Sequence, residues 1–194
     1  MFILASSSLT RKALLEKAGL TFLTMKPDVD ESTLHQKYKN LSAKEFALKL
    51  ASEKSFSISA KNPNQLVVGA DQILYCNQTI FHKPSSIDEA RGMLQKLRGR
   101  EHQLTTAISC QLNGEQIWNY QDEAKLTLRE YSNSFLESYL SLNSISTLSS
   151  AGAYQLESHG IQLFDKIEGD YFTILGFPLV EFLKFLRNRG ILET

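Results

Sequence analysis

The sequence predicts an α/β fold in a single domain that spans residues 1–194. Short apolar runs typical of strands alternate with longer segments whose apolar residues recur at helical spacing, and this alternation continues along the whole chain. A chain of 194 residues can bury one good hydrophobic core. No linker is visible between the predicted elements. We therefore expect one domain, in which two lobes can flank a cleft, and not two independent domains.

The chain opens with a strand, a turn and a helix. Residues 2–5 are an all-apolar run that predicts a buried strand. Leucine and alanine then recur at helical spacing over residues 9–18, until Gly19 ends the helix. A second strand at residues 22–25 runs into a turn-rich acidic loop at residues 27–31. These elements form the start of an alternating α/β chain.

A long helix and a hairpin follow. Alanine, leucine and phenylalanine at helical spacing predict a helix from Ser42 to about Ala60, which Pro63 closes off. Residues 66–70 are an apolar run that predicts a buried strand, followed by a tight hairpin through residues 76–78. The next helix is predicted at about residues 87–97, with two acids in its first turn, where the helix dipole favours negative charge.

The last third of the chain begins with two strands. Loose alternation over residues 103–129 predicts two long antiparallel strands joined at Asn113-Gly114, a pair of residues that suits a two-residue turn. The remaining predictions are a helix at residues 134–140, a Ser-rich loop at 141–150, a strand at 161–164 and an amphipathic helix at 179–187.

Charge and composition exclude several classes of partner. The 21 basic and 21 acidic residues cancel, so no overall field attracts polymeric nucleic acid or an anionic membrane. No apolar run approaches the length that spans a bilayer. The two cysteines, Cys76 and Cys110, lie in no CxxC or Cys/His cluster, which argues against a disulfide framework or zinc. We expect a soluble protein of the reducing cytoplasm.

The turn after the first strand is a candidate phosphate site. Residues 5–12, ASSSLTRK, place serine hydroxyls and backbone amides at the start of a helix, where anions bind. Arg11 can offer a fork of donors to phosphate oxygens. The plainer interpretation is that Ser8 only caps the helix. The motif alone does not decide between phosphate binding and helix capping.

Acidic residues supply candidate metal ligands. Asp28, Asp30, Glu31 and Asp71 carry the carboxylate oxygens that Mg²⁺ or Mn²⁺ prefers. Acids in a loop are usually solvated, and this interpretation holds for Asp28 and Asp30. Asp71 differs because it ends a predicted buried strand, where a carboxylate is costly unless it is partnered or used. Asp71 is therefore the leading candidate for a functional acid.

Two lysines and a glutamate complete the candidates. Lys54 and Lys83 can lie along a cleft and neutralise phosphate charge, although most lysines have no specific role. The predicted hairpin can bring Lys83 near Asp71. Glu157 can accept two hydrogen bonds from the N1–H and amine edge of guanine, or it is an ordinary surface glutamate.

An ordered set of motifs covers nearly the whole chain. The motifs are ILASSS with Arg11 and ALLEKAGL, VDE at 29–31, Lys54, GADQ at 69–72, HKP at 82–84, LRGREH at 97–102, AGAYQLE at 151–157 and IEGDYFTILGFPL at 167–179. In its order and spacing this set resembles the Maf family of nucleoside triphosphate pyrophosphatases, and the ordered set makes the likeness specific.

The resemblance implies a fold and a reaction. The expected fold is a mixed twisted sheet with flanking helices and two lobes around a deep nucleotide-binding cleft, related to that of ITPase-like enzymes and often found as a homodimer. The expected reaction hydrolyses the bond between the α- and β-phosphates of a nucleoside triphosphate, yielding a monophosphate and diphosphate. A divalent cation, Mg²⁺ or Mn²⁺, is the expected cofactor.

The resemblance also assigns roles to individual residues. Asp71 matches the proposed general base, which takes a proton from the attacking water or orients it. Glu31 matches an acid near the metal, which Asp71 also contacts. The residues that match positions gripping the phosphates are Ser6, Arg11, Lys54 and Lys83.

Three positions bear on the choice of base. Gln72 and Glu157 resemble the branch of the family that acts on 7-methyl-GTP, whereas the branch that acts on dTTP and UTP tends to carry threonine and glutamine there. Thr10 departs from the 7-methyl-GTP branch, which tends to have an aromatic residue that can stack on a cationic base. A house-cleaning 7-methyl-GTP pyrophosphatase is the expected function. The alternatives are a dTTP/UTP-type enzyme, a phosphatase that releases orthophosphate, and a low-turnover nucleotide-binding regulator of cell division.

Overall fold

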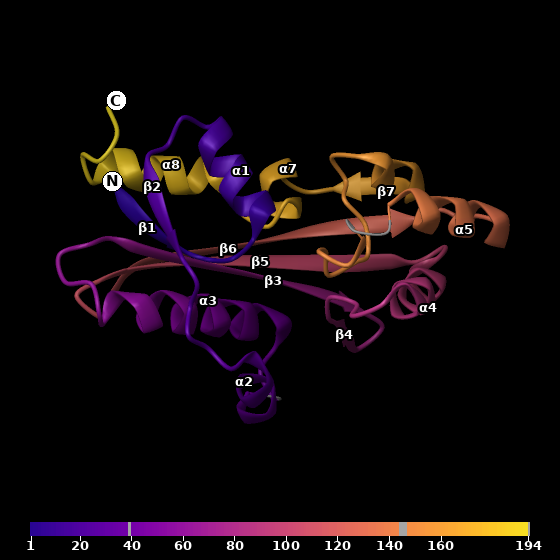
Figure 1. Cartoon of the computed structure of the whole chain (residues 1–194), viewed down its shortest axis with the longest axis horizontal. Coiled ribbons are helices and arrows are strands. Elements are labelled where there is room, and N and C mark those ends of the chain that lie inside the picture. Colours follow the sequence, from indigo (N-terminus) through magenta and orange to yellow (C-terminus); the bar gives the residue numbers. More distant parts are fainter. Residues whose placement is uncertain (39, 144–146, 194) are drawn as a thin grey trace. The chain divides into compact units, whose positions relative to one another are not determined.

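The computed structural model describes residues 1–38, 40–143 and 147–193, in which strands and helices alternate (Figure 1). The first part of the chain contains β1 (Phe2–Ala5), α1 (Leu9–Lys17), β2 (Phe22–Met25), α2 (Glu31–Lys37), α3 (Ala43–Ser59), β3 (Val67–Cys76) and β4 (Thr79–Phe81). The second part contains α4 (Ile87–Leu97), β5 (Glu101–Leu112), β6 (Glu115–Leu128), α5 (Asn133–Leu142), the 3-10 helix η1 (His159–Leu163), β7 (Phe164–Glu168), α7 (Tyr171–Ile174) and α8 (Leu179–Asn188).

Most predicted elements are confirmed. β1, β2 and α4 have the predicted bounds, and α1, α3, α5 and α8 differ from the prediction by three residues or fewer at each end. Serine side chains cap four of these helices: those of Ser8, Ser42, Ser86 and Ser132 each accept a hydrogen bond from a backbone N–H in the first turn. Only the cap at Ser8 was predicted from the sequence, and the other three follow the same local pattern.

Three predictions are wrong in their bounds or type. β3 continues to Cys76 instead of ending at residue 70, so Asp71 lies inside a strand and not at its tip. The acidic loop at 27–31 leads directly into α2, a helix that the sequence analysis did not predict. Residues 161–163 form part of the 3-10 helix η1, and the strand begins only at Phe164. Residues 144–146 of the predicted Ser-rich loop lie outside the described residues.

The strands form a mixed sheet, as expected. In the part of the chain that the structure describes, seven strands take part, in the order β2-β1-β3-β5-β6-β7, and β4 pairs with β3. β1 runs parallel to β2 and β3, whereas β4 is antiparallel to β3 and β7 is antiparallel to β6. The turns at Asn77-Gln78 and Asn113-Gly114 have positive φ angles at both residues, as two-residue hairpin turns require. Both predicted hairpins are therefore confirmed.

The chain divides into two compact units. The first unit comprises Met1–Gln72, Thr106–Asp122 and Tyr171–Thr194, and the second comprises Ile73–Thr105 and Glu123–Asp170. The two expected lobes thus have counterparts in two units. The assignment of residues 1–194 to a single domain stays a prediction.

The core of the first unit lies on both faces of β1. Phe2 and Leu4 belong to one cluster with buried side chains of α1 and α8, whereas Ile3 and Ala5 pack with Ile58 of α3 on the other face. Figure 1 shows α1 and α8 on one side of β1 and α3 on the other. A strand covered on both faces is typically apolar at nearly every position, which explains the uninterrupted run of β1 in the sequence.

α3 lies against β3 at a glycine. Gly69 has no side chain, and a Cβ atom there would overlap the carbonyl oxygen of Ala51 and lie 2.7 Å from the backbone nitrogen of Ser55. Only a residue without a Cβ allows the helix to approach the strand this closely. This approach holds α3 beside the next residues of β3, Ala70 and Asp71.

The second unit has its own core, built around α4 and α5. These helices carry buried leucines, and the guanidinium of Arg91 on α4 donates to Glu137 on α5 at 2.7 Å. The hydroxyl of Tyr131 donates to the carbonyl oxygen of Leu94 at 2.7 Å. His102 at the start of β5 is 2% exposed, and its Nε2 lies 2.7 Å from the hydroxyl of Tyr154. The unit therefore contains a buried polar pair within an apolar core.

His102 predicts a loss of stability in mild acid. Burial lowers its pKa from the ordinary 6.5 to about 4. Between these two values the unfolded chain binds a proton that the folded chain excludes, so the free energy of unfolding falls as the pH falls from 6.5 towards 4. Over this whole pH range, the free energy of unfolding falls by about 3 kcal/mol because of His102. We expect His102→Gln, which keeps a neutral side-chain N–H, to flatten this decline in urea titrations at several pH values. A variant with the same decline as the wild type would contradict the assignment.

None of the helices formed by the described residues is long and apolar enough to cross a membrane.

Candidate active site

Asp71 lies in the middle of β3 and forms a buried ion pair. Its side chain is 10% exposed, and its Oδ1 accepts a hydrogen bond from Nζ of Lys54 at 2.5 Å. Lys54 is on α3, and its side chain is 11% exposed. The close approach of α3 to β3 at Gly69 explains how two residues 17 positions apart meet. The sequence prediction that Asp71 must be partnered or used agrees with this pairing.

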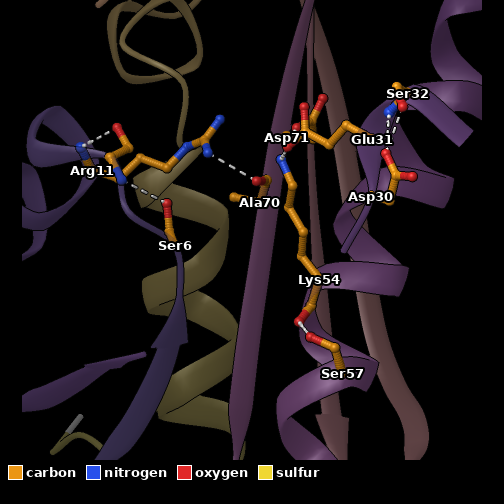
Figure 2. Close-up of polar contacts among 10 residues, drawn as sticks. Ser6, Arg11, Asp30, Glu31, Ser32, Lys54, Ser57, Ala70 and Asp71 are labelled. Atoms are coloured by element: carbon orange, nitrogen blue, oxygen red, sulfur yellow. Dashed lines mark hydrogen bonds and ion pairs between the residues drawn. The ribbon is translucent and has the colours of Figure 1, made fainter. Parts of the chain in front are cut away.

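Glu31 completes the cluster from a third element. It is the first residue of α2, and its Oε1 lies 2.6 Å from Nζ of the same lysine. Its side chain is 54% exposed, so the cluster reaches solvent on the side of α2. Figure 2 shows Asp71, Lys54 and Glu31 converging from β3, α3 and α2. We call these three residues the acid–lysine cluster.

Two carboxylates share one ammonium in the acid–lysine cluster, in which Asp71 and Lys54 are largely removed from water and Glu31 is half exposed. The charges of both acids also act on the guanidinium of Arg11. Removing one member of a buried pair leaves the other uncompensated, and this is costly. Lys54 has a second partner in Glu31, so loss of Asp71 alone does not leave the lysine without a counter-ion. The cluster is thus suited to exchanging partners when further charged groups arrive.

Arg11 lies beside the cluster but points its donors at the backbone. Its Nε donates to the carbonyl oxygen of Gly176 at 2.8 Å and its Nη1 to that of Ala70 at 2.9 Å. Burial lowers the pKa of its guanidinium, while the charges of Asp71 and Glu31 act in the opposite direction. These two bonds use two of the five N–H donors of the guanidinium, so N–H groups on Nη1 and Nη2 remain for the phosphate fork that the sequence predicts, and that role stays a prediction. Arg11 also ties the strand residue before Asp71 to the segment that follows α7.

The serine turn is arranged mainly as a helix cap. Oγ of Ser8 accepts from the backbone N–H of Arg11 at 3.3 Å, which confirms the capping interpretation. Oγ of Ser6 accepts from the backbone N–H of Ser8 at 3.1 Å, and Ser6 is buried. Thr10 lies in the first turn of α1 and is half-buried. A phosphate-binding role for Ser6 and a base-selecting role for Thr10 remain predictions.

Gln72 follows Asp71 and holds α7 in place. Its Nε2 donates to the hydroxyl of Thr106 at 2.9 Å and to the carbonyl oxygens of Thr173 and Ile174, each at 3.0 Å. In this arrangement its amide N–H groups are used within the first unit. The role predicted for Gln72 in the choice of base stays a prediction.

Lys83 and Glu157 belong to the second unit. Lys83 follows β4 in the confirmed hairpin, and both side chains are exposed. The charge of Glu157 contributes to raising the pKa of Tyr139, although burial of the tyrosine is the main cause. The roles predicted for Lys83 at the phosphates and for Glu157 at the base stay predictions.

The acid–lysine cluster provides a test of whether a metal fits. Oxygen atoms of Glu31 and Asp71 converge on one point, which Nζ of Lys54 occupies. Within residues 1–38, 40–143 and 147–193, no group of three or more histidine, cysteine, aspartate or glutamate side chains is arranged to hold a metal ion. Two carboxylates supplemented by substrate phosphates and water are the set that Mg²⁺ commonly uses. The two acids therefore fit a substrate-bound Mg²⁺ or Mn²⁺, provided that Lys54 moves aside.

Asp30 has a role that the sequence analysis missed. It was interpreted as a solvated loop acid, but it is the N-cap of α2. Hydrogen bonds from Ser32 and Thr33, chiefly from their hydroxyls, lower the pKa of Asp30 to about 2. The signal in the sequence is an aspartate followed by serine and threonine two and three positions later, directly before a helix.

Comparison with known proteins places the chain in a family. The family model described as "Maf-like protein" matches residues 1–189, so the chain belongs to the Maf family. A "7-methyl-GTP pyrophosphatase" of Rhizobium johnstonii is 42% identical over 98% of this chain and 97% of its own length. A "Nucleoside triphosphate pyrophosphatase" of Caulobacter vibrioides is 43% identical over 98% of this chain and 96% of its own.

A solved structure gives a more distant likeness. The nucleoside-triphosphatase / dITP/XTP pyrophosphatase of Mycobacterium abscessus is 12% identical, with a TM-score of 0.43 over 98% of this chain and 95% of that one. A likeness this distant informs neither the fold nor the function.

Proposed function

We propose that this protein is a nucleoside triphosphate pyrophosphatase, a hydrolase acting on acid anhydrides that converts a nucleoside triphosphate and water into a monophosphate and diphosphate. Support comes from family membership and from full-length relatives that carry this activity in their names. The acid–lysine cluster is the single structural observation that carries the proposal, because it combines an acid, a cation and a solvent-facing carboxylate.

The residues of the acid–lysine cluster have different roles in the proposed reaction. The carboxylate of Asp71 accepts a proton from, or orients, the water that attacks the α-phosphorus. In the structure this carboxylate accepts a hydrogen bond from Lys54. A bound triphosphate offers Lys54 new oxygen partners, and a shift of the ammonium towards them exposes Asp71 to the water. The same shift places positive charge where negative charge accumulates.

Glu31 and Asp71 are the residues that would hold a divalent cation, Mg²⁺ or Mn²⁺. When bound, the cation neutralises negative charge on the phosphate oxygens. Glu31 is the more exposed of the two acids, since its side chain is 54% exposed and that of Asp71 is 10% exposed. Ser6, Arg11 and Lys83 supply further contacts to the phosphates in this proposal.

A guanine-type nucleotide such as 7-methyl-GTP is the proposed substrate, and Glu157 is the residue proposed to recognise its edge. A carboxylate can accept both hydrogen bonds from N1–H and the exocyclic amine, whereas a glutamine offers one acceptor and one donor.

Glu157→Gln should therefore shift substrate preference. We expect kcat/KM for 7-methyl-GTP to fall about 10- to 100-fold relative to that for UTP, which corresponds to losing one hydrogen bond to a charged group. Steady-state kinetics on a panel of 7-methyl-GTP, GTP, dTTP and UTP measures the ratio. Glu115→Gln on the exposed end of β6 serves as the matched control. An unchanged ratio in Glu157→Gln would remove this residue from base recognition.

The alternative functions are separable by product. Incubation with a nucleotide panel and Mg²⁺ or Mn²⁺, followed by assay of diphosphate, tests the reaction, and a preference for dTTP and UTP would favour the pyrimidine-type enzyme. Stepwise orthophosphate would indicate a phosphatase, and binding without turnover a nucleotide-binding regulator of cell division. A cytoplasmic location and a homodimer are part of the proposal, and the latter is testable by light scattering.

A further inference from the structure

Asp30 fixes the place where α2 begins. Its Oδ1 accepts hydrogen bonds from the backbone N–H of Ser32 at 3.0 Å and of Thr33 at 3.3 Å, and from Oγ of Ser32 at 2.6 Å. Its Oδ2 accepts from Oγ1 of Thr33 at 2.6 Å. Figure 2 shows Asp30 next to Glu31 with its bonds to Ser32. Both carboxylate oxygens of Asp30 are thus directed at the first turn of the helix.

Apolar packing contributes little to the position of α2. The described side chains of the helix are exposed, apart from Leu34, which is half-buried. At its far end, the ring of Tyr38 lies 5.4 Å from Nζ of Lys49 on α3. At its start, Glu31 reaches Lys54, also on α3. A seven-residue helix of this kind is marginal on its own. Among the described side chains, the polar contacts at the two ends of α2 are therefore the main ones that fix its position.

We propose that Asp30 is a positioning residue for Glu31: by capping α2, it sets the first helical residue so that the carboxylate of Glu31 meets Lys54 beside Asp71. This inference rests on the proposed function, in which Glu31 holds the divalent cation. Asp30 itself points back into its own helix and acts on the reaction only through Glu31.

Replacing the cap should separate positioning from folding. Asp30 is exposed, so Asp30→Ala leaves the core intact. Asp30→Asn keeps an oxygen that accepts from the backbone N–H groups and should rescue the cap. Ser86→Ala removes an equivalent cap from α4 and is the matched control, because α4 carries none of the proposed site residues. Glu31→Gln shows how far the affinity for Mn²⁺ and the turnover depend on the carboxylate of Glu31 itself.

The first readout needs no metal. Amide hydrogen exchange in residues 31–37 should be about fivefold faster in Asp30→Ala than in the wild type, which is the equivalent of losing one helix cap. Asp30→Asn should exchange close to the wild-type rate. Unchanged exchange in Asp30→Ala, or equal acceleration in Asp30→Asn, would overturn the inference.

The second readout is the affinity for Mn²⁺, measured by electron paramagnetic resonance with a non-hydrolysable α,β-methylene analogue of GTP. Asp30→Ala should raise the Kd for Mn²⁺ about fivefold and raise the KM for Mn²⁺ likewise, while kcat at saturating Mn²⁺ stays near the wild-type value. Ser86→Ala should change neither. Wild-type affinity in Asp30→Ala would overturn the positioning role and leave the proposed function standing. A wild-type protein that neither binds Mn²⁺ with the analogue nor releases diphosphate would overturn both.

Discussion

Asp71→Asn should abolish diphosphate release and leave a folded protein. An asparagine at this position can still accept a hydrogen bond from Lys54 but cannot take a proton from water. A positioned general base contributes roughly 10²- to 10⁴-fold, so we expect kcat to fall by at least about 100-fold. Because Lys54 keeps Glu31 as a partner at 2.6 Å, the loss of stability should be far smaller than that of orphaning a buried charge.

The measurement combines turnover with stability. Diphosphate release from 7-methyl-GTP is followed in Mg²⁺ and in Mn²⁺, and urea titration shows whether unfolding remains cooperative. Asp165→Asn, which neutralises an exposed acid in β7, is the matched control and should retain full activity. Turnover at the wild-type rate in Asp71→Asn would remove the proposed base. A variant that is inactive because it is unfolded would show no cooperative transition.

Gly69→Ala should destabilise the first unit and disrupt the site together. The added methyl group would overlap the carbonyl oxygen of Ala51 and press on the backbone of Ser55, and helix backbone cannot yield as a flexible side chain does. Overpacking typically costs ~1–3 kcal/mol, and a clash with backbone belongs at the upper end of this range. Relief of the clash requires α3 to move away from β3, which carries Lys54 away from Asp71.

The control for this prediction is another glycine-to-alanine change. A Cβ at Gly92, inside α4, would meet no atom within 4 Å. Gly92→Ala should therefore stabilise the protein by about 0.5–1 kcal/mol through helix propensity alone. Thermal melts and diphosphate assays of both variants separate the two outcomes. Full stability and activity in Gly69→Ala would show that α3 and β3 are not held as closely as the structure has them.

The sequence predicted elements well where the signal is local. The apolar run of β1 and the spacing that marks α1, α3, α4 and α5 depend only on neighbouring residues, and the positions of these elements were confirmed. Of the serines that cap these four helices, only Ser8 was predicted as a cap. β3 was predicted too short because Asp71 breaks the apolar pattern. That acid is tolerated inside the strand only because Lys54 pairs with it, and this contact is invisible in the local sequence.

The arrangement of the site depended on contacts between distant segments. The sequence identified Asp71 and Lys54 separately, but their pairing follows from the packing of α3 on Gly69, which spacing does not encode. The sequence also did not reveal that two nitrogen atoms of Arg11 donate to backbone carbonyls of residues far along the chain. Glu31 was placed in a loop because α2 lacks an apolar face strong enough to mark it as a helix.

Attack of water on the α-phosphorus is the central claim, and isotope labelling tests it directly. The wild-type protein is incubated with 7-methyl-GTP and Mg²⁺ in water enriched in ¹⁸O, and the products are resolved by ³¹P nuclear magnetic resonance. We expect one ¹⁸O atom in the nucleoside monophosphate and none in the diphosphate. Label in the diphosphate, or release of orthophosphate in its place, would contradict it.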